Sequence, residues 1–263
     1  MTLSKMIDGL HHQWRAPQGQ APVLVFANSL GTDFRLWDRV VARMPADWGI
    51  LRLDKRGHGL STLTEGVSID SLAADIETLL EAYAVQRFAG IGLSVGGLIM
   101  QRLALRRAGA MTHLVLSDTA AQIGTAAAWN QRIAAVTEGG VAAISDQTLK
   151  NWFPAEYHAT DDFRMWRAML ERTLPAGYAA VAAAIRDADL TEDLGRITQP
   201  TLAIVGEMDG STPPKMVRQM ADRIPGARFE QIARAGHVPC IDRPGAFSDL
   251  LLAHLGAATG SGA

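Results

Sequence analysis

The sequence predicts an α/β fold, in which a mostly parallel central sheet carries helices on both of its faces. Short continuous apolar runs recur along the chain at the length of strands that are buried on both sides. Segments with apolar residues at helical spacing follow most of these runs. The alternation stops between residues 120 and 190, where only helical signals occur. We therefore expect a core domain made of residues 1–119 and 191–263, with a helical cap inserted at 120–190.

Length, charge and cysteine content narrow the range of expected partners. A chain of 263 residues suits one α/β domain with an insertion, and its formal net charge of −2 supplies no basic field for nucleic acid. The N-terminus has no apolar signal core and no window is apolar over about 18 residues, so we expect a cytoplasmic protein without a membrane partner. The single cysteine, Cys240, excludes an internal disulfide and a cysteine-based metal cluster. A small molecule is the expected partner, and the oligomeric state stays open.

The first half of the core is expected to contain an edge hairpin, two buried strands separated by a helix, and a second helix that begins at capping residues. These elements are expected at 6–15, 23–27, 37–44, 50–53 and 68–83. The second half adds a strand before the cap, then two strands that alternate with two helices. These are expected at 113–116, 200–206, 214–223, 228–232 and 244–255, followed by a small-residue tail that we expect to fray.

One stretch, residues 88–102, organises the predicted core. A buried-strand signal ends at Leu93, a Gly-x-Ser-x-Gly turn follows, and apolar residues then recur at helical spacing. The motif places Ser94 on a sharp elbow between strand and helix. Gly92 and Gly96 are required because Cβ atoms there would collide where strand and helix pass closely.

A serine hydroxyl becomes a nucleophile when a base lies within hydrogen-bond reach and a carboxylate orients that base. Asp209 follows one predicted strand and His237 follows the next, so the order is serine, acid, histidine. Asp118 also ends a strand near Ser94 and competes for the role of the acid. We favour Asp209, because its loop directly precedes the strand that carries His237. An oxyanion hole would use the backbone N–H groups of Val95 and Leu30.

The other reactive residue types receive structural interpretations. His58 lies in a glycine-bounded turn and is expected to bond to the backbone, whereas the remaining histidines have no matching partner spacing. Cys240 precedes an isoleucine and is expected to be apolar and structural. We expect no metal site and no cofactor.

The chain resembles the α/β-hydrolases over its whole length, and more narrowly the 3-oxoadipate enol-lactonases. The broad resemblance rests on the motifs at 54–61, 92–96, Asp209 and 236–237. The narrower one rests on Asn-Ser-Leu-Gly-Thr at 28–32, Ser-Thr-Pro-Pro at 211–214 and Gly-His-Val-Pro-Cys at 236–240. Two differences are Asn28-Ser29, where many such enzymes have His-Gly, and Gly210-Ser211, where Pro or Ala is expected after the acid.

The resemblance implies a triad of Ser94, Asp209 and His237 that hydrolyses the enol-lactone to 3-oxoadipate in aromatic catabolism. The substrate carries a carboxylate, so we expect a cap cation to bind it, with Arg132 first and Lys150, Arg164 and Arg167 behind it. Trp129 and Trp152 are candidate substrate contacts, although cap aromatics can equally serve only to pack the insertion onto the sheet.

Four alternatives remain open at this point. The chain could be an esterase of neutral substrates, a carbon–carbon bond hydrolase or a perhydrolase with the same triad, because fold alone does not determine function. It could also be a non-enzymatic receptor that retained the pocket. A haloalkane dehalogenase is disfavoured, because it would need an acidic nucleophile in place of Ser94.

Overall fold

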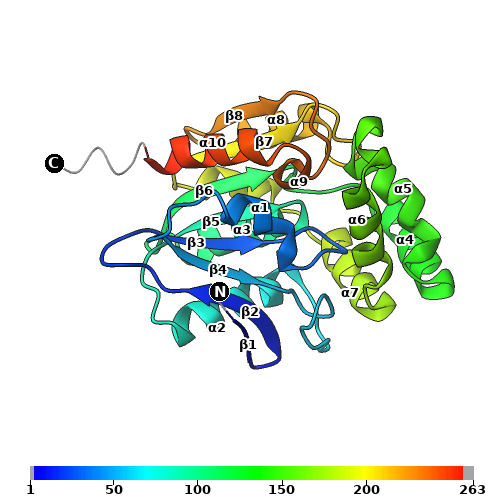
Figure 1. Cartoon of the computed structure of the whole chain (residues 1–263), viewed down its shortest axis with the longest axis horizontal. Helices are drawn as coiled ribbons and strands as arrows, with labels where there is room; N and C mark the ends of the chain where they lie inside the picture. Colours follow the sequence, from blue (N-terminus) through cyan, green and yellow to red (C-terminus); the bar gives the residue numbers. More distant parts are fainter. Residues whose placement is uncertain (1–2, 257–263) are drawn as a thin grey trace.

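The computed structural model describes residues 3–256, which form an eight-stranded sheet with helices on both faces (Figure 1). The strand order is β1-β2-β4-β3-β5-β6-β7-β8. The first two pairings, β1 with β2 and β2 with β4, are antiparallel, and all others are parallel. The strands are β1 (Ser4–Ile7), β2 (Leu10–Arg15), β3 (Val23–Ala27), β4 (Gly49–Leu53), β5 (Phe88–Leu93), β6 (Met111–Ser117), β7 (Thr201–Gly206) and β8 (Arg228–Ile232). The predicted fold class is confirmed.

Helices of the core cover both faces of this sheet. They are η1 (Phe34–Trp37), α1 (Asp38–Val41), α2 (Ile69–Ala82), α3 (Val95–Arg106), η3 (Thr191–Arg196), α8 (Pro214–Ala221), α9 (Pro239–Asp242) and α10 (Pro244–Gly256). In Figure 1, α1 and α10 lie on one face and α2 and α3 on the other. Helix α2 begins at a capping box formed by Ser68 and Ser71, as the sequence predicts, and buries its apolar stripe.

The predicted helix at 37–44 is wrong in extent. The Asp33 side chain accepts a hydrogen bond from the backbone N–H of Arg35 and starts a 3-10 turn, which leads into the single turn of α1. Beyond α1, the N–H groups of Arg43 and Met44 bond three residues back rather than four. The chain tightens there because the residue before Pro45 is disfavoured in α conformation. The small-residue tail expected to fray extends to 257–263, which lie outside the described residues.

Between β6 and β7 the described chain is helical and contains no strand, as predicted. The helices are α4 (Ala126–Gly139), α5 (Ala142–Trp152), η2 (Ala155–Ala159), α6 (Asp161–Glu171) and α7 (Pro175–Arg186). Figure 1 shows α4 to α7 gathered at one end of the sheet, beyond the carboxyl ends of the parallel strands. We keep the name cap for residues 120–190, whose standing as a separate unit stays a prediction.

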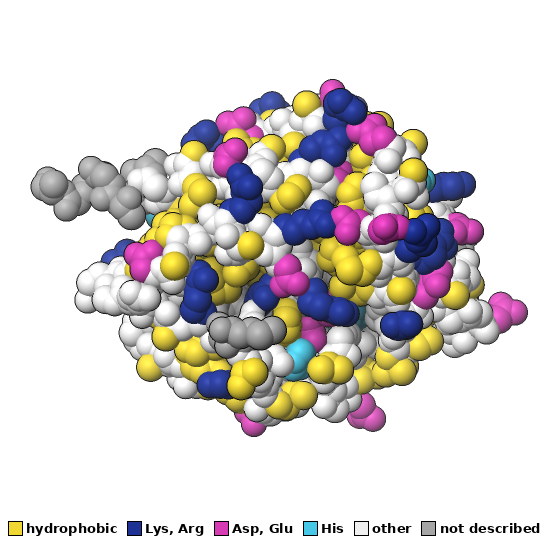
Figure 2. Space-filling view, viewed as in Figure 1, with side chains coloured by type: hydrophobic (Ala, Val, Ile, Leu, Met, Phe, Trp, Pro, Cys, Tyr) yellow, Lys and Arg dark blue, Asp and Glu magenta, His cyan; other side chains and the backbone are white. Residues whose placement is uncertain are grey.

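The surface agrees with the charge expected from composition. On the face shown in Figure 2, basic and acidic side chains are interspersed rather than gathered by sign. Over residues 3–256, no helix combines the length and the apolar character needed to cross a bilayer.

Two glycines bring the cap and the core into backbone contact. Gly177 of α7 lies against Gly57, in the turn after β4, so a Cβ atom on Gly177 would collide with the Gly57 carbonyl oxygen. Because a backbone atom cannot rotate away as a side chain can, Gly177 is a tight point in the docking of the cap.

We predict that Gly177→Ala destabilises the protein by about 1–3 kcal/mol, because the added methyl group overpacks this contact. Gly109→Ala is the matched control, since a Cβ atom at Gly109 meets nothing within 4 Å. The measurement is the free energy of unfolding in urea. Equal stabilities of the two variants would contradict the close contact.

Candidate active site

Ser94 lies on the elbow that the sequence predicts. Strand β5 ends at Leu93 and α3 begins at Val95, with Ser94 between them at φ 58° and ψ −120°. A positive φ is strained for a residue with a side chain. The Thr119 hydroxyl donates a 2.7 Å hydrogen bond to the Ser94 carbonyl oxygen and helps to hold this conformation. Ser94 is 8% exposed, so its hydroxyl lies in a nearly closed site.

The glycines beside Ser94 are explained by backbone contacts. A Cβ atom on Gly92 would collide with the carbonyl of Gly96, and one on Gly96 would collide with the carbonyl oxygen of Ala27 at the end of β3. The first collision is the predicted one between strand and helix. The second shows that α3 also touches a neighbouring strand.

Asp209 and His237 form a buried pair at the same edge of the sheet. His237 Nδ1 lies 2.9 Å from Asp209 Oδ2. Asp209 also accepts hydrogen bonds from the backbone N–H groups of Ser211 and Thr212, at 2.7 and 3.0 Å, and from the Thr212 hydroxyl at 2.6 Å. Burial acts to raise the pKa of Asp209, but the charge of His237 and these hydrogen bonds outweigh it and bring the pKa to about 2. Asp209 is therefore ionised.

Asp118, the competing acid, differs from Asp209 in its protonation. It is fully buried and accepts hydrogen bonds from the Ser117 hydroxyl and the Gly206 N–H group. Burial raises the pKa of Asp118 well above its usual value, and the adjacent Asp209 raises it further. Asp118 therefore keeps its proton while Asp209 carries the charge, which supports Asp209 as the partner of His237.

Asp118, Asp209 and His237 also form a group that could hold a metal ion, which the sequence did not predict. One ligand atom from each lies within 4.8 Å of the others. A neutral carboxylic acid is a poor metal ligand, and Asp209 is already bonded to His237. The donor set therefore fits an acid–base pair better than a metal site.

The two residues predicted to supply oxyanion donors are Leu30, in the loop after β3 (residues 28–33, hereafter the oxyanion loop), and Val95, the first residue of α3. Leu30 is 5% exposed and Val95 is fully buried, and their backbone N–H groups find no acceptor among the described residues. The next N–H group in the loop, that of Gly31, donates a 3.0 Å hydrogen bond to His58 Nε2. His58 thus bonds to the backbone as predicted, although its partner in this loop was not foreseen.

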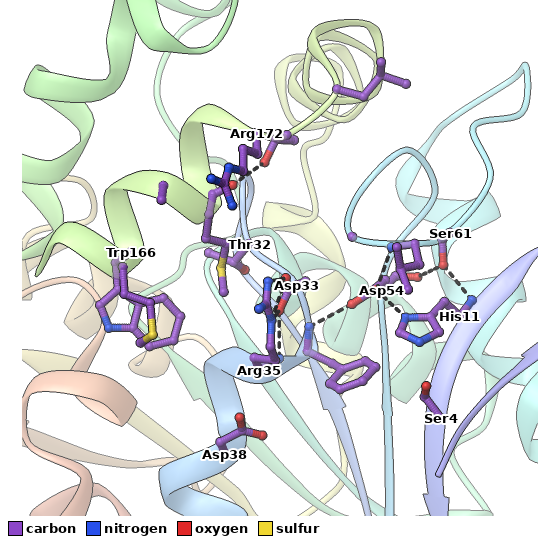
Figure 3. Close-up of a pocket in the computed structure, with 18 of the residues that line it drawn as sticks. Ser4, His11, Thr32, Asp33, Arg35, Asp38, Asp54, Ser61, Trp166 and Arg172 are labelled. Carbon is purple, nitrogen blue, oxygen red and sulfur yellow. Dashed lines mark hydrogen bonds and ion pairs between the residues drawn. The ribbon is translucent and has the colours of Figure 1, made fainter. Parts of the chain in front are cut away.

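His11 also has a partner, contrary to the sequence analysis. Its Nδ1 lies 2.7 Å from Asp54 Oδ2, while Asp54 accepts hydrogen bonds from the N–H groups of Phe34 and Leu60 (Figure 3). Spacing could not reveal the pair, because the two residues are 43 positions apart. Asp54 thus links the N-terminal hairpin, the turn after β4 and the loop after β3. Cys240, by contrast, is fully buried as expected, and burial raises the pKa of its thiol.

A cavity of about 730 Å³ lies beside these loops rather than over the elbow. Figure 3 shows Trp166 and Arg172 on its cap side and Asp33 and Asp54 on its core side. Neither the elbow serine nor the acid–base pair is among the described residues that line it. The candidate catalytic groups therefore lie under the cap, apart from this groove.

The C-terminal end of α5 contacts both loops of the acid–base pair. The Gly210 N–H group donates to the Asn151 carbonyl oxygen at 3.3 Å, and a Cβ atom on Gly236 would collide with the Trp152 carbonyl. A Cβ atom on Gly210 would come within 3.1 Å of Asn151 Cα. The glycine that departs from the family pattern thus stands where the cap backbone comes close. The ring of Trp152 is buried, at 4% exposure.

Arg132 differs from the other candidate cations of the cap. Its Nε donates to the Tyr178 hydroxyl at 2.7 Å and its Nη2 to the Thr148 hydroxyl at 2.6 Å, and no described carboxylate pairs with it. The guanidinium lies 5.7 Å from the ring centres of Trp129 and Tyr178. The Tyr178 ring in turn packs against Gly31 of the oxyanion loop. Arg132 is therefore a cation without a counter-ion on the side of the cap that meets the site.

The remaining cap cations are less suited to bind a substrate. Arg164 pairs with Asp161, and Arg167 pairs with Asp146 and Glu171. Lys150 is exposed. Trp129 Nε1 donates to the carbonyl oxygen of Ile123, which orients its ring within the cap.

Comparison with known proteins agrees with this geometry. The family model of the alpha/beta hydrolase fold matches residues 22–244. The chain is 32% identical to 3-oxoadipate enol-lactonase 1 of Acinetobacter baylyi, over 94% of this chain and 90% of that protein. It is 25% identical to a pimeloyl-[acyl-carrier protein] methyl ester esterase of Vibrio vulnificus, over 95% and 100%. The solved structure of the enol-lactonase from Burkholderia xenovorans superposes with a TM-score of 0.90 at 33% identity, over 96% and 99%.

Because Asp209 is ionised and Asp118 is neutral, we predict that the two acids affect the free energy of unfolding with opposite pH dependences. A pKa of Asp209 near 2, below the usual 3.8, stabilises the fold above about pH 4, and this stability is lost as the pH falls toward 2. The advantage of wild type over Asp209→Asn should therefore shrink by about 2 kcal/mol over that range. For Asp118 only the unfolded chain ionises as the pH rises through its usual value, so wild type should lose stability relative to Asp118→Asn.

Urea unfolding of the three proteins at several pH values between about 2 and 6 measures both slopes. Slopes of the same sign for the two variants would contradict the assignment.

Proposed function

The chain belongs to the α/β-hydrolase family, and within that family we propose that it is a serine hydrolase that opens 3-oxoadipate enol-lactone with water to give 3-oxoadipate. The observation that carries the proposal is the ionised Asp209 bonded to buried His237. The Ser94 elbow lies at the same edge of the sheet, with the N–H groups of Leu30 and Val95, for which no described residue is an acceptor. The likeness to enol-lactonases over nearly the whole chain supports the substrate.

The proposed reaction proceeds through an acyl-enzyme. His237 removes the proton of the Ser94 hydroxyl as its oxygen attacks the lactone carbonyl carbon. The N–H groups of Leu30 and Val95 bind the oxyanion that forms. The ring carbon–oxygen bond then breaks, and the leaving oxygen takes the proton from His237 to give an enol, which tautomerises to the ketone.

Water completes the cycle. His237 removes a proton from a water molecule that attacks the acyl carbon, and Ser94 leaves with that proton. Asp209 stays ionised throughout and stabilises the imidazolium that forms twice in each cycle. These steps consume only the lactone and water, so the proposal needs no metal and no cofactor. The cytoplasmic location stays a prediction.

Arg132 is the proposed partner of the substrate carboxylate. It carries a charge that no described acid neutralises, and it reaches the oxyanion loop through Tyr178. Guanidinium binds a carboxylate through two parallel hydrogen bonds, which would orient the lactone ring over Ser94. Trp129 and Trp152 are proposed as walls of the same site.

A wider ester hydrolase is the second candidate. The observation in its favour is the similarity to an esterase over the whole chain, because the same triad acts on an ordinary ester carbonyl. The two candidates differ in whether a carboxylate on the substrate is needed.

We predict that wild type consumes the enol-lactone rapidly and that Ser94→Ala lowers kcat by about 10⁵-fold or more, because no nucleophile remains. Asp209→Asn should lower kcat by about 10⁴-fold, whereas the neutral Asp118 should tolerate replacement by asparagine far better. The decay of lactone absorbance measures all four proteins. Inactive wild type on the lactone, with cleavage of a neutral activated ester, would reject the substrate and leave the hydrolase.

We further predict that Arg132→Gln lowers kcat/KM for the lactone by about 10- to 100-fold, the value of a charge-assisted hydrogen bond. For a neutral ester of similar size kcat/KM should change little, because no carboxylate is present. Arg164→Gln is the control, since Arg164 is exposed and already paired with Asp161. Equal losses on both substrates would show that Arg132 only supports the cap.

A further inference from the structure

Lys55, in the turn after β4, is a buried cation that the proposed reaction has not used. It is 4% exposed. Its Nζ donates hydrogen bonds to the carbonyl oxygens of Ser29, at 2.6 Å, and Thr32, at 3.2 Å. No described carboxylate lies within ion-pair distance of it. Burying an ammonium group without a carboxylate partner costs free energy. The two carbonyl oxygens of the oxyanion loop that it does bind therefore point to a role in that loop.

We propose that Lys55 is a positioning residue for the oxyanion hole, which aims and polarises the N–H group of Leu30 by holding the carbonyl oxygen of Ser29. This inference rests on the proposed function, because it concerns the same site. Lys55 lies outside the triad, and we expect it to stabilise the transition state.

The peptide group that joins Ser29 to Leu30 is planar. The Ser29 carbonyl and the Leu30 N–H group are the two ends of one peptide unit, and in a planar trans unit they point in opposite directions. A cation that holds the oxygen therefore sets the direction of the hydrogen. The Thr32 hydroxyl donates to the same oxygen at 2.8 Å, so both acceptor positions of that oxygen are used.

The same contact strengthens the donor. A hydrogen bond to the carbonyl oxygen draws electron density away from the amide nitrogen, and hydrogen bonds in series polarise one another in a low-dielectric interior. The Leu30 N–H group consequently becomes a better donor to an oxyanion. The gain applies when negative charge develops, so it should appear in kcat rather than in substrate affinity.

The neighbouring loop N–H groups are already committed. Gly31 donates to His58 Nε2, and Phe34 donates to Asp54 Oδ1 at 2.8 Å, the bond drawn between loop and turn in Figure 3. Burial lowers the pKa of His58 well below its usual value, and the charge of Lys55 lowers it further, so the ring is neutral and accepts. With the bond from Lys55 to Ser29, the turn after β4 thus holds the chain on both sides of Leu30, and no described residue accepts a hydrogen bond from the Leu30 N–H group.

Burial also makes the charge of Lys55 sensitive to pH. It lowers the pKa of Lys55 to about 7, against the opposing charges of Asp54 and Asp33. The other charged or titratable groups around it are His58 and Arg56 of its own turn and Asp75 of α2, which Arg56 holds through two hydrogen bonds. A neutral amine still has two N–H groups for its two carbonyl partners. Raising the pH through 7 should therefore remove the polarising charge and leave the loop in place.

The test compares Lys55→Met with wild type on the lactone and on p-nitrophenyl acetate, a neutral activated ester. We expect kcat to fall about 10- to 100-fold on both, less than the loss of a whole oxyanion donor, with KM nearly unchanged. Arg56→Gln is the matched control, because it removes the adjacent cation whose bonds go to Asp75 and Thr64 instead of the loop. It should leave kcat close to wild type.

A second variant separates positioning from folding. Lys55→Ala leaves space for propylamine, which should restore part of kcat, whereas propanol of the same length should restore less because it is uncharged. A folded Lys55→Met with wild-type kcat, or a folded Lys55→Ala that amine does not improve, overturns the proposal. If neither variant folds, the wild-type profile decides: kcat on the ester must decline at alkaline pH as the Lys55 ammonium group loses its proton, and a profile that stays on an alkaline plateau overturns the proposal.

The failure of the proposed function gives a different result. Wild type that cleaves the ester and not the lactone contradicts the substrate, and the test of Lys55 then proceeds on the ester alone. Wild type that cleaves neither overturns both proposals.

Discussion

The contact between the first turn of α3 and the end of β3 is the constraint on which the site depends. Gly96 lies against the carbonyl oxygen of Ala27, so no side chain separates the helix from the strand. This contact sets how far Ser94 and Val95, at the start of α3, lie from Leu30, three residues beyond Ala27. The two proposed oxyanion donors come from distant parts of the sequence, and they can bind one oxygen atom only if that spacing is held to a fraction of an ångström. The strained backbone of Ser94 is the local consequence, because the turn must be sharp enough to bring helix and strand together.

Burial opposes the charged forms of Asp209, Asp118, His58 and Lys55, and the neighbours of each group determine its charge. Asp209 is ionised because three hydrogen-bond donors and His237 face it, whereas Asp118, one strand away, keeps its proton because it has fewer donors and a charged neighbour. His58 is neutral and accepts a hydrogen bond from the oxyanion loop. Lys55, whose pKa burial lowers to about 7, donates hydrogen bonds to the same loop. Similar degrees of burial therefore leave these four groups in different states at the same edge of the sheet. One is the charged partner of His237, one is a neutral acid, one is a hydrogen-bond acceptor and one is a hydrogen-bond donor.

The sequence predicts what depends on local pattern. The strands at 23–27 and 228–232 follow from apolar runs or position in the alternation, and the start of α2 follows from Ser68, whose capping bonds lie within four residues. It does not predict bonds between distant segments. The pairing of His11 with Asp54 and the donation from Lys55 to Ser29 both join strands that are neighbours only in the folded sheet. Nor does the sequence explain why Gly210 departs from the family pattern, because the backbone of α5 lies beside it only in the folded chain.

In the proposed function, groups of the core carry out the reaction and groups of the cap select the substrate. In the proposed reaction, Ser94, His237 and the N–H groups of Leu30 and Val95 act on an ester carbonyl and its oxyanion. Every ester and lactone shares these features, so the core cannot by itself select among them. Selection requires a group that meets the part of the substrate remote from the carbonyl. The group proposed for this role is Arg132. No described carboxylate pairs with its guanidinium, whose hydrogen bonds go to neutral hydroxyls, so a negatively charged ligand is favoured there. The case for a carboxylate-bearing lactone therefore rests on the cap, and the case for a hydrolase rests on the core.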